Sequence, residues 1–404
     1  MTFAASVRRL TAVAAACALG AHAGPQCDAD GTCGADEAGM MQVRTKPQHL
    51  QLESKIDPLE RQITKYWDGL AAKRAHGFNS RSPAAKRGQS ECGYPECRKP
   101  NKAYEAIIGL KPGVQWMDHG GYCGSWSIQH GALAKGAWIS QQQVRDHSSP
   151  GGGNDNEILE TNIDDALDKL KLKAEGFDYK NLPTPQAKTY LKWIKSKLAA
   201  GHAVVWMIMM SFQAGQYPLY PSLPYGIYGH IEPVVGVMSD HPLNDTEYYD
   251  DDVLLHFTDA DDQTYYRSMA SLPDDQWMNK TCTKAIAYPG APCVYEKWGF
   301  GWAIEGVQDE RPGVPVLLSV EPAESEPNTR LGEPPIMLRG TLAISNLTEG
   351  ERYAIYRWDS VADAFNYSRA RLVRNFTAVG PSESYEDPVH IASSSATYFR
   401  CVPL

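Results

Sequence analysis

The chain has 404 residues, of which 43% are hydrophobic and 22% are charged, and its formal net charge at pH 7 is −9. This length allows two domains of ordinary size together with an N-terminal extension. Proteins that bind nucleic acid present a basic surface to the phosphates, and no stretch rich in Lys and Arg occurs here. Nucleic acid is therefore excluded as an expected partner.

The N-terminus has the three parts of a secretory signal peptide. Arg8 and Arg9 precede an apolar stretch at residues 10–20, and residues 21–23 (Ala-His-Ala) form a small-x-small cleavage pattern. The apolar stretch is shorter than the ~20 residues that span a bilayer, so a membrane anchor is the less favoured alternative. We expect residues 1–23 to be a signal peptide, and the mature protein to be exported and to have no membrane span.

Predicted glycosylation sites point to the same compartment. Five Asn-x-Ser/Thr sequons lie in the second half of the chain, and together they favour an extracellular or lumenal glycoprotein. They begin at Asn244, Asn279, Asn346, Asn366 and Asn375.

Cysteine usage fits an oxidising compartment. Of the nine cysteines, Cys17 leaves with the signal peptide and eight remain. Three pairs close in sequence are disulfide candidates, with the connectivity left open. The candidates are Cys27, Cys33, Cys92, Cys97, Cys282 and Cys293. Cys123 and Cys401 are left over, as working thiols or as partners in a further bridge.

Residues 24–90 are expected to form a leader segment. Residues 51–75 carry apolar side chains at helical spacing, and residues 78–89 are rich in Ser, Arg, Gly and Lys, with a dibasic Lys86-Arg87. Two interpretations stay open: a cleaved propeptide and a flexible N-terminal arm.

Residues 91–311 alternate helical and strand patterns, which predicts an α+β domain. The predicted helices cover residues 124–136, 162–175 and 185–200. Gly176 is expected to close the second helix, while Thr184 caps the start of the third and Gly201 follows its end. Continuous apolar runs suit strands that are buried on both faces. The predicted strands cover residues 202–210, 230–238 and 253–259.

Residues 312–404 lose the helical periodicity and are expected to form a small all-β sandwich. The predicted strands cover residues 314–320, 336–344, 353–358 and 397–402. Residues 346–353 (Asn-Leu-Thr-Glu-Gly-Glu-Arg-Tyr) resemble the segments of fibronectin-type-III-like sandwiches in which a turn precedes a tyrosine. Such modules usually bind, space or stabilise.

Cys123 is the candidate nucleophile. It follows Gly120-Gly121-Tyr122 and opens a predicted helix. A helix N-terminus stabilises negative charge and so favours a thiolate, and a backbone N–H there can point at a developing oxyanion. The alternative is a buried or disulfide-bonded cysteine, the commoner fate in an exported chain.

His230 is the candidate base, because a thiolate nucleophile normally works with a base and with a third group that orients the base. His230 opens one predicted strand, and Asp259 ends the next, with Asp261 as the alternative orienting carboxylate. Antiparallel pairing of these strands is expected to bring imidazole and carboxylate together. His256 lies inside a strand, where a buried structural histidine is expected.

These segments resemble the papain-like cysteine peptidase clan, and most closely its bacteriocin-processing peptidases. The similarity lies in the order of Cys-Gly-Ser before a helix, residues 198–205 (Leu-Ala-Ala-Gly-His-Ala-Val-Val), Gly229-His230, and a strand that ends in Asp259. It spans about residues 110–265. The resemblance implies that Cys123 attacks a carbonyl, that His230 shuttles the proton, and that Asp259 holds the ring.

The chain departs from the family pattern in three places. Papain enzymes read Cys-Gly-Ser-Cys-Trp with the second cysteine as nucleophile, so alignment on Trp126 leaves Ser125 in that position; we align on Cys123-Gly124 instead. Gln115 is the nearest candidate for the oxyanion-hole glutamine, although its separation from Cys123 is slightly long. Residues 298–302 (Trp-Gly-Phe-Gly-Trp) resemble a papain segment and are expected to be structural.

No metal and no cofactor are expected. Residues 250–252 and 259–262 are dense in carboxylates, but neither has the full pattern of a calcium loop, and solvated acidic turns are favoured. No cysteine or histidine spacing fits a zinc site.

The sequence thus predicts a secreted thiol protease-like enzyme, a cysteine hydrolase or acyl transferase, with a papain-like α+β core followed by a small all-β sandwich. Its expected partner is a peptide or protein substrate. The alternative is a non-catalytic extracellular binding or adhesion protein on the same fold, with Cys123 bridged, for example to Cys401.

Overall fold

The computed structural model describes residues 97–113, 122–148, 157–158, 162–178, 181–183, 186–212, 226–245, 247–257, 264–272, 274–275, 291–295, 301–323 and 337–404. The predicted signal peptide and the predicted leader segment therefore lie outside the described residues. The same holds for these residues named above: Cys27, Cys33, Cys92, Gln115, Gly120, Gly121, Thr184, Asp259, Asp261, Asn279 and Cys282.

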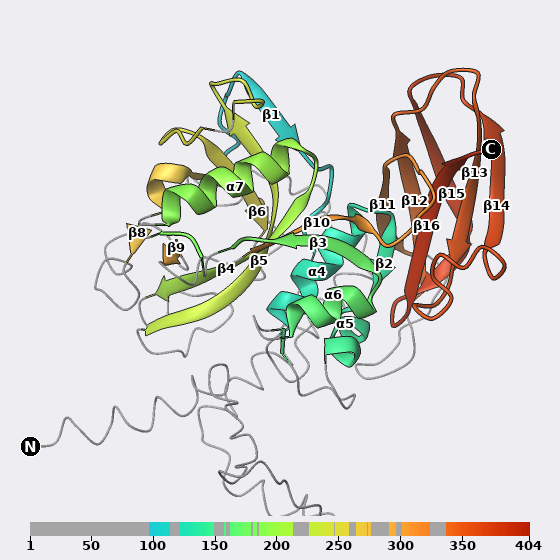
Figure 1. Cartoon of the computed structure of the whole chain (residues 1–404), viewed down its shortest axis with the longest axis horizontal. Coiled ribbons are helices and arrows are strands. Elements are labelled where there is room, and N and C mark those ends of the chain that lie inside the picture. Colours follow the sequence, from blue (N-terminus) through green and yellow to red (C-terminus); the bar gives the residue numbers. More distant parts are fainter. Residues whose placement is uncertain are drawn as a thin grey trace, which may run out of the picture. The chain divides into compact units, whose positions relative to one another are not determined.

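A nine-stranded sheet carries the region before residue 308 (Figure 1). Its strands are β1 (Tyr104–Ile107), β3 (Leu172–Gly176), β4 (Ala203–Phe212), β5 (Gly226–Ser239), β6 (Val253–Phe257), β7 (Thr264–Ser268), β8 (Asp274–Asp275), β9 (Ala291–Tyr295) and β10 (Gly301–Val307). The main path runs β3-β10-β4-β5-β6-β7, and β1 also pairs with β5. β5 therefore lies near the middle of the sheet, where apolar side chains such as Val234 and Val235 are fully buried.

The described residues hold four α-helices, all in this region: α4 (Cys123–Leu133), α5 (Gln141–Ser148), α6 (Ile163–Lys169) and α7 (Ala187–Ala199). A 3₁₀ turn, η5 (Met269–Ser271), follows β7. α4 packs on β5, β4 and β10, and α7 packs on β4 and β5. None of the described helices combines the length and the apolar character that crossing a bilayer requires.

Two of the three helix predictions are confirmed. α4 matches the helix expected from residue 124, and α7 matches the one expected over 185–200, with Gly201 after its end at a φ of +79°. Glycine reaches that left-handed conformation without the steric cost that other residues meet.

The helix predicted over residues 162–175 is wrong in its second half. α6 ends at Lys169, Lys171 turns the chain with a φ of 58°, and Leu172–Gly176 forms β3. β3 pairs antiparallel with β10, so that Leu172 lies opposite Val307. The ladder hydrogen bonds to a strand more than a hundred residues away outweigh the local helical pattern.

The C-terminal region forms two sheets. The first has the order β11-β12-β15 and the second β14-β13-β16-β2. Their strands are β11 (Val316–Pro322), β12 (Met337–Ser345), β13 (Arg352–Trp358), β14 (Arg371–Thr377), β15 (Ser382–Ala392), β16 (Ala396–Pro403) and β2 (Ala137–Ile139). Side chains of both sheets, among them Leu318, Leu342, Ile355 and Phe399, form one apolar cluster.

One strand of the second sheet comes from the helical region of the chain. β2, between α4 and α5, pairs with β16, so that Ala137 lies opposite Tyr398. The Tyr398 hydroxyl also donates a buried hydrogen bond of 2.8 Å to the carbonyl oxygen of Leu170, beyond α6. The C-terminal strands are therefore joined to the region around α4 by backbone pairing through β2 and by buried contacts such as that of Tyr398.

The prediction of an α+β papain-like core with a small all-β sandwich is wrong as a fold class, because the described chain is predominantly β. It contains sixteen strands and four α-helices within the described residues, arranged in several mostly antiparallel sheets. Nine of these strands were not predicted from the sequence: β1, β2, β3, β7, β8, β9, β10, β14 and β15. The first three are short and depend on pairing with partners that are distant in the chain.

Candidate active site

Cys123 is the first residue of α4, and its thiol is free and partly exposed. The preceding Tyr122 is fully buried, and the Arg145 guanidinium carbon lies 3.7 Å from the centre of its ring. The Tyr122 hydroxyl donates a hydrogen bond of 3.2 Å to Oε1 of Gln142. α5 thus holds Tyr122, the residue just before α4, in place, and this fixes the position of Cys123 at the start of the helix.

Cys401 is the second free cysteine among the described residues, and it is buried. Burial raises the pKa of its thiol to about 12, which makes it unreactive at neutral pH. The bridge from Cys123 to Cys401 that the alternative function invokes is therefore not formed. Cys97 is disulfide-bonded, and Cys92, the partner suggested by spacing, lies outside the described residues.

Gly124 brings the start of α4 against β5. A Cβ at this position would lie 2.5 Å from Cβ of Ile158 and 3.2 Å from Cδ1 of Ile231, so no larger residue fits without movement. Gly124 and Ile231, which directly follow Cys123 and His230 in the chain, are thus in close contact. Because side chains alternate along a strand, Ile231 faces α4, while His230 and Glu232 share the other face of β5.

His230 belongs to a row of polar side chains on β5, β6 and β7. Its Nε2 lies 3.7 Å from Oε1 of Glu232, and its side chain is 11% exposed while that of Glu232 is 0% exposed. The other oxygen of Glu232, Oε2, lies 2.7 Å from Nδ1 of His256. Nε of Arg267 completes the row at 3.0 Å from Nε2 of His256.

The hydrogen bonds assign the proton of His256. Arg267 can only donate, so Nε2 of His256 accepts and must be unprotonated. Nδ1 therefore carries the proton and donates it to Glu232. Burial lowers the pKa of His256, against the opposing effect of the Glu232 carboxylate, which agrees with a neutral ring. His256 is thus the buried, hydrogen-bonded histidine that its place in a strand predicted.

Sequence reasoning missed Glu232. Asp259 and Asp261, the predicted orienting carboxylates, lie outside the described residues, as does Gln115. The missed signal is the spacing His230-Ile-Glu232: on a strand, residues two apart lie on one face. Burial also favours the alignment on Cys123 over the one on Trp126, because Ser125 is fully buried whereas Cys123 is partly exposed.

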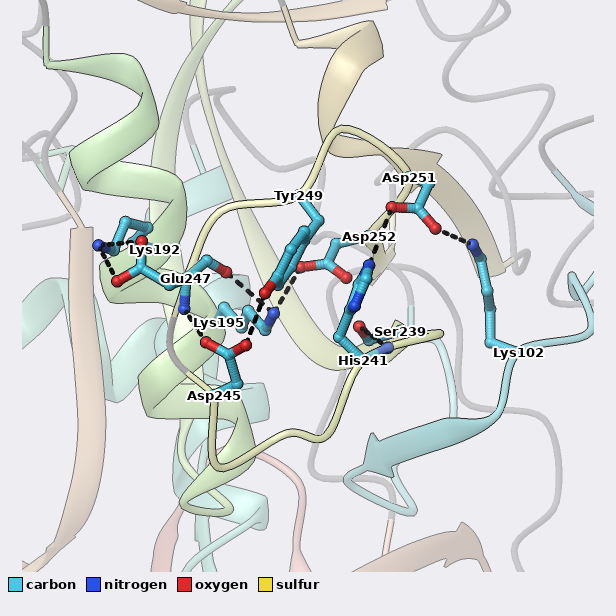
Figure 2. Close-up of polar contacts among 10 residues, drawn as sticks. All are labelled: Lys102, Lys192, Lys195, Ser239, His241, Asp245, Glu247, Tyr249, Asp251 and Asp252. Carbon is cyan, nitrogen blue, oxygen red and sulfur yellow. Dashed lines mark hydrogen bonds and ion pairs between the residues drawn. The ribbon is translucent and has the colours of Figure 1, made fainter.

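Two of the three acidic residues at 250–252 are engaged in ion pairs. Lys102 lies 2.9 Å from Asp251, and Lys195 lies 2.6 Å from Asp252 (Figure 2). Within the described parts of the chain, no group of three or more His, Cys, Asp or Glu side chains is arranged to hold a metal ion.

The remaining predictions concern the surface and the aromatic segment before β10. The four sequon asparagines that the structure describes are exposed, namely Asn244, Asn346, Asn366 and Asn375. Trp302 is buried, and its Nε1 donates a hydrogen bond of 2.6 Å to Asp164 at the start of α6. For Trp302, the contact agrees with the structural role expected for this segment; residues 298–300 lie outside the described residues.

Comparison with known proteins returns little. No family model matches the chain, and no curated protein matches it significantly. Among solved structures, the cysteine protease and lectin-like domains of Cwp84, a surface-layer-associated protein of Clostridium difficile, show 10% identity over 73% of this chain and 72% of that one, with a TM-score of 0.26. Clostridial Cwp84 after propeptide cleavage shows 11% identity over 73% and 81%, with a TM-score of 0.23. TM-scores this low do not establish a common fold.

Proposed function

We propose that this protein is a secreted cysteine hydrolase or acyl transferase, with Cys123 as nucleophile and His230 as base. The observation that carries the proposal is the free, partly exposed thiol at the first position of α4. A helix N-terminus presents the positive end of its dipole, which favours a negative charge at its first position. The substrate class is a peptide or a related amide.

In the proposed reaction, the Cys123 proton passes to His230 and the thiolate attacks the substrate carbonyl carbon. The C=O π bond opens to a tetrahedral oxyanion, for which backbone N–H groups at the start of α4 are the expected donors. When the C–N bond breaks, His230 gives its proton to the leaving amine. Water or another acceptor then attacks the thioester and releases the acyl group.

His230 lies on the face of β5 opposite to Ile231, the residue that contacts α4, so the proposal requires the His230 ring to move in order to reach the thiol. It is tested by alkylation of the secreted protein with iodoacetamide at pH 5.5 without reductant, with each cysteine followed by mass spectrometry. An ordinary thiol with a pKa of about 8.5 reacts slowly at this pH, whereas an activated thiolate reacts at once. Cys401 serves as an internal control, because burial holds its thiol protonated.

We expect rapid labelling of Cys123 and a rate about 100-fold lower or more in His230→Ala, the range in which a general base usually contributes. An unlabelled or disulfide-linked Cys123 in the native protein would refute the proposal. The same experiment on His241→Ala, a partly exposed histidine beyond the end of β5, should leave the rate unchanged.

A further inference from the structure

A lysine and a histidine join the turn after α4 to the turn after α7. Nζ of Lys135, just beyond the end of α4, donates a hydrogen bond of 3.0 Å to the carbonyl oxygen of Gly201. The same nitrogen lies 3.0 Å from Nδ1 of His202, the residue between Gly201 and β4. The side chains of Lys135 and His202 are both partly buried. The contact therefore links the ends of two helices that both pack on β4 and β5.

The hydrogen bond defines the protonation state of the His202 ring. Burial lowers the pKa of Lys135 to about 8, so its side chain is still mostly an ammonium group at neutral pH. An ammonium group donates and cannot accept, so Nδ1 of His202 accepts and must be unprotonated. The ring is therefore neutral, with its proton on Nε2. Burial, followed by the charge of Lys135, lowers the pKa of His202, which agrees with a neutral ring.

The charges around His202 balance only while the ring is neutral. Two cations act on the ring, Lys135 and Lys197 on α7, together with the carboxylate of Glu305 on β10. Lys197 lies 3.1 Å from Oε1 of Glu305 and 2.6 Å from Oε2 of Glu175 on β3. The cluster thus combines two lysines with two carboxylates. A proton on His202 adds a third positive charge, and it does so 3.0 Å from the Lys135 ammonium group.

We propose that the contact between Lys135 and His202 is an acid-sensitive switch that holds the C-terminal end of α4 to the turn between α7 and β4. When the pH falls and His202 takes up a proton, Nδ1 becomes a donor and the hydrogen bond with Lys135 is lost. The two positive charges then repel each other across a partly buried contact, where water and salt screen them less than at an open surface. Lys135 moves away, and the end of α4 is released.

The helix that the switch acts on begins with Cys123. Acid therefore loosens one end of the element that carries the free thiol at its other end. The sign follows from the lowered pKa of His202: the contact stabilises the fold above pH 6.5 and is lost as the pH falls through the pKa of the folded protein. The switch does not depend on the reaction proposed above.

The first test is the titration of His202 in the native protein labelled with ¹⁵N-histidine. Nitrogen chemical shifts report both the pKa and the ring nitrogen that carries the proton. We expect the proton on Nε2 at pH 7.5 and a pKa below 6.5. Lys135→Met should raise this pKa by about half a unit or more, since a neighbouring cation disfavours the charged ring. Lys192→Met is the matched control, because Lys192 lies on α7 but pairs with Glu247, and it should leave the pKa unchanged.

The second test asks whether protonation of His202 releases the end of α4. Hydrogen exchange is measured at pH 7.5 and at one unit below the pKa of His202, with each rate corrected for intrinsic exchange. The amides of residues 134–136 report the release, because their N–H groups donate to carbonyl oxygens of the last turn of α4. We expect their protection to fall about threefold or more in the native protein at the lower pH, which corresponds to half a pKa unit of coupling.

His202→Gln is the control for the exchange experiment. The glutamine oxygen accepts from Lys135 at either pH, so protection of residues 134–136 should change less in this variant than in the native protein. Protonation of His130 on the same helix, whose pKa is about 4, lowers protection equally in both proteins. The difference between the two proteins therefore isolates the contribution of His202.

Each outcome supports or overturns the switch. A proton on Nδ1 of His202 at pH 7.5, or a pKa that Lys135→Met leaves unchanged, overturns it. An equal loss of protection in the native protein and in folded His202→Gln shows that the end of α4 is not released by this histidine, and this also overturns it. If His202→Gln does not fold, the signal that moves in Lys135→Met identifies His202, and the tautomer and pKa in the native protein decide.

Discussion

Two completely buried carboxylates lie close together in the sequence, Glu232 on β5 and Asp252 just before β6, and they differ in what faces them. Asp252, just before β6, lies 2.6 Å from Nζ of Lys195 on α7, and both side chains are 0% exposed. Glu232 on β5 faces two imidazoles instead. A lysine cation neutralises a carboxylate permanently, whereas an imidazole can take up or release a proton near neutral pH. The first arrangement suits a structural contact, and the second suits proton transfer.

The contacts around Lys195 explain what the structural pair holds. Lys195 also donates to the carbonyl oxygen of Glu247 at 3.0 Å, and its Nζ lies 4.8 Å from the centre of the Tyr249 ring. Tyr249 stacks on His241 with 3.5 Å between ring centres. Figure 2 shows these groups gathered around the segment between β5 and β6. The pair therefore ties α7 to the connection between the strands that carry His230, Glu232 and His256.

The largest effect on stability is expected from Lys195→Met. This change leaves the Asp252 charge buried without its cation, and breaking such a pair typically costs about 3–5 kcal/mol of unfolding free energy. Denaturant unfolding measures the loss, and Cys123 alkylation at a temperature where the variant is folded should stay at the native rate. The double variant Lys195→Met/Asp252→Leu should be more stable than Lys195→Met alone. If Lys195→Met lost the alkylation of Cys123 but kept its stability, the assignment of a structural role to Asp252 would be contradicted.

A pH dependence of intermediate size is expected from His130 on α4. Burial lowers its pKa from 6.5 to about 4, so the unfolded chain binds a proton there at pH values where the folded protein does not. Stability is therefore fully present above pH 6.5 and falls as the pH drops towards 4, by about 3 kcal/mol. Burial lowers the pKa of His256 as well, which acts in the same direction.

The measurement is the unfolding free energy at pH 7.5, 5.5 and 4.0. His130→Leu places an apolar side chain in the same core, so the dependence of the unfolding free energy on pH should become weaker. A slope that is equal in the variant and the native protein would assign the pH dependence to other groups.

The smallest effect is expected at Lys102, which pairs with Asp240 at 2.7 Å and with Asp251 at 2.9 Å. Both carboxylates are about half exposed, with side-chain values of 50% and 52%. Pairs screened by water in this way contribute about 0.2–1 kcal/mol, and Lys102→Ala should cost no more. The loss of unfolding free energy should be smaller in 1 M salt, which screens exposed charges. If Lys102→Ala cost as much as Lys195→Met, the difference in solvent exposure between the two ion pairs would not explain their contributions.

Local patterns in the chain identified part of the candidate site. Cys123 at the start of a helix and His230 on a strand were recognised because a helix start and an apolar strand are both visible in a short window. Glu232 was not recognised, since a glutamate between apolar residues of a strand usually marks an exposed edge. Its burial depends on the strands on either side of β5, which come from elsewhere in the chain.

The sequence by itself determined the elements with strong local patterns, which are α4, α7 with Gly201 after its end, and the strands β4, β5, β6, β11, β12, β13 and β16. Tertiary structure decided the others. β3 replaced the end of a predicted helix because β10 was available to pair with it, and β2 became a strand because β16 lies beside it. Strand pairing is made by backbone hydrogen bonds between distant segments, and these bonds leave little trace in the local order of side chains. For the same reason the predominantly β character of the chain, and the row from His230 to Arg267, emerged only in three dimensions.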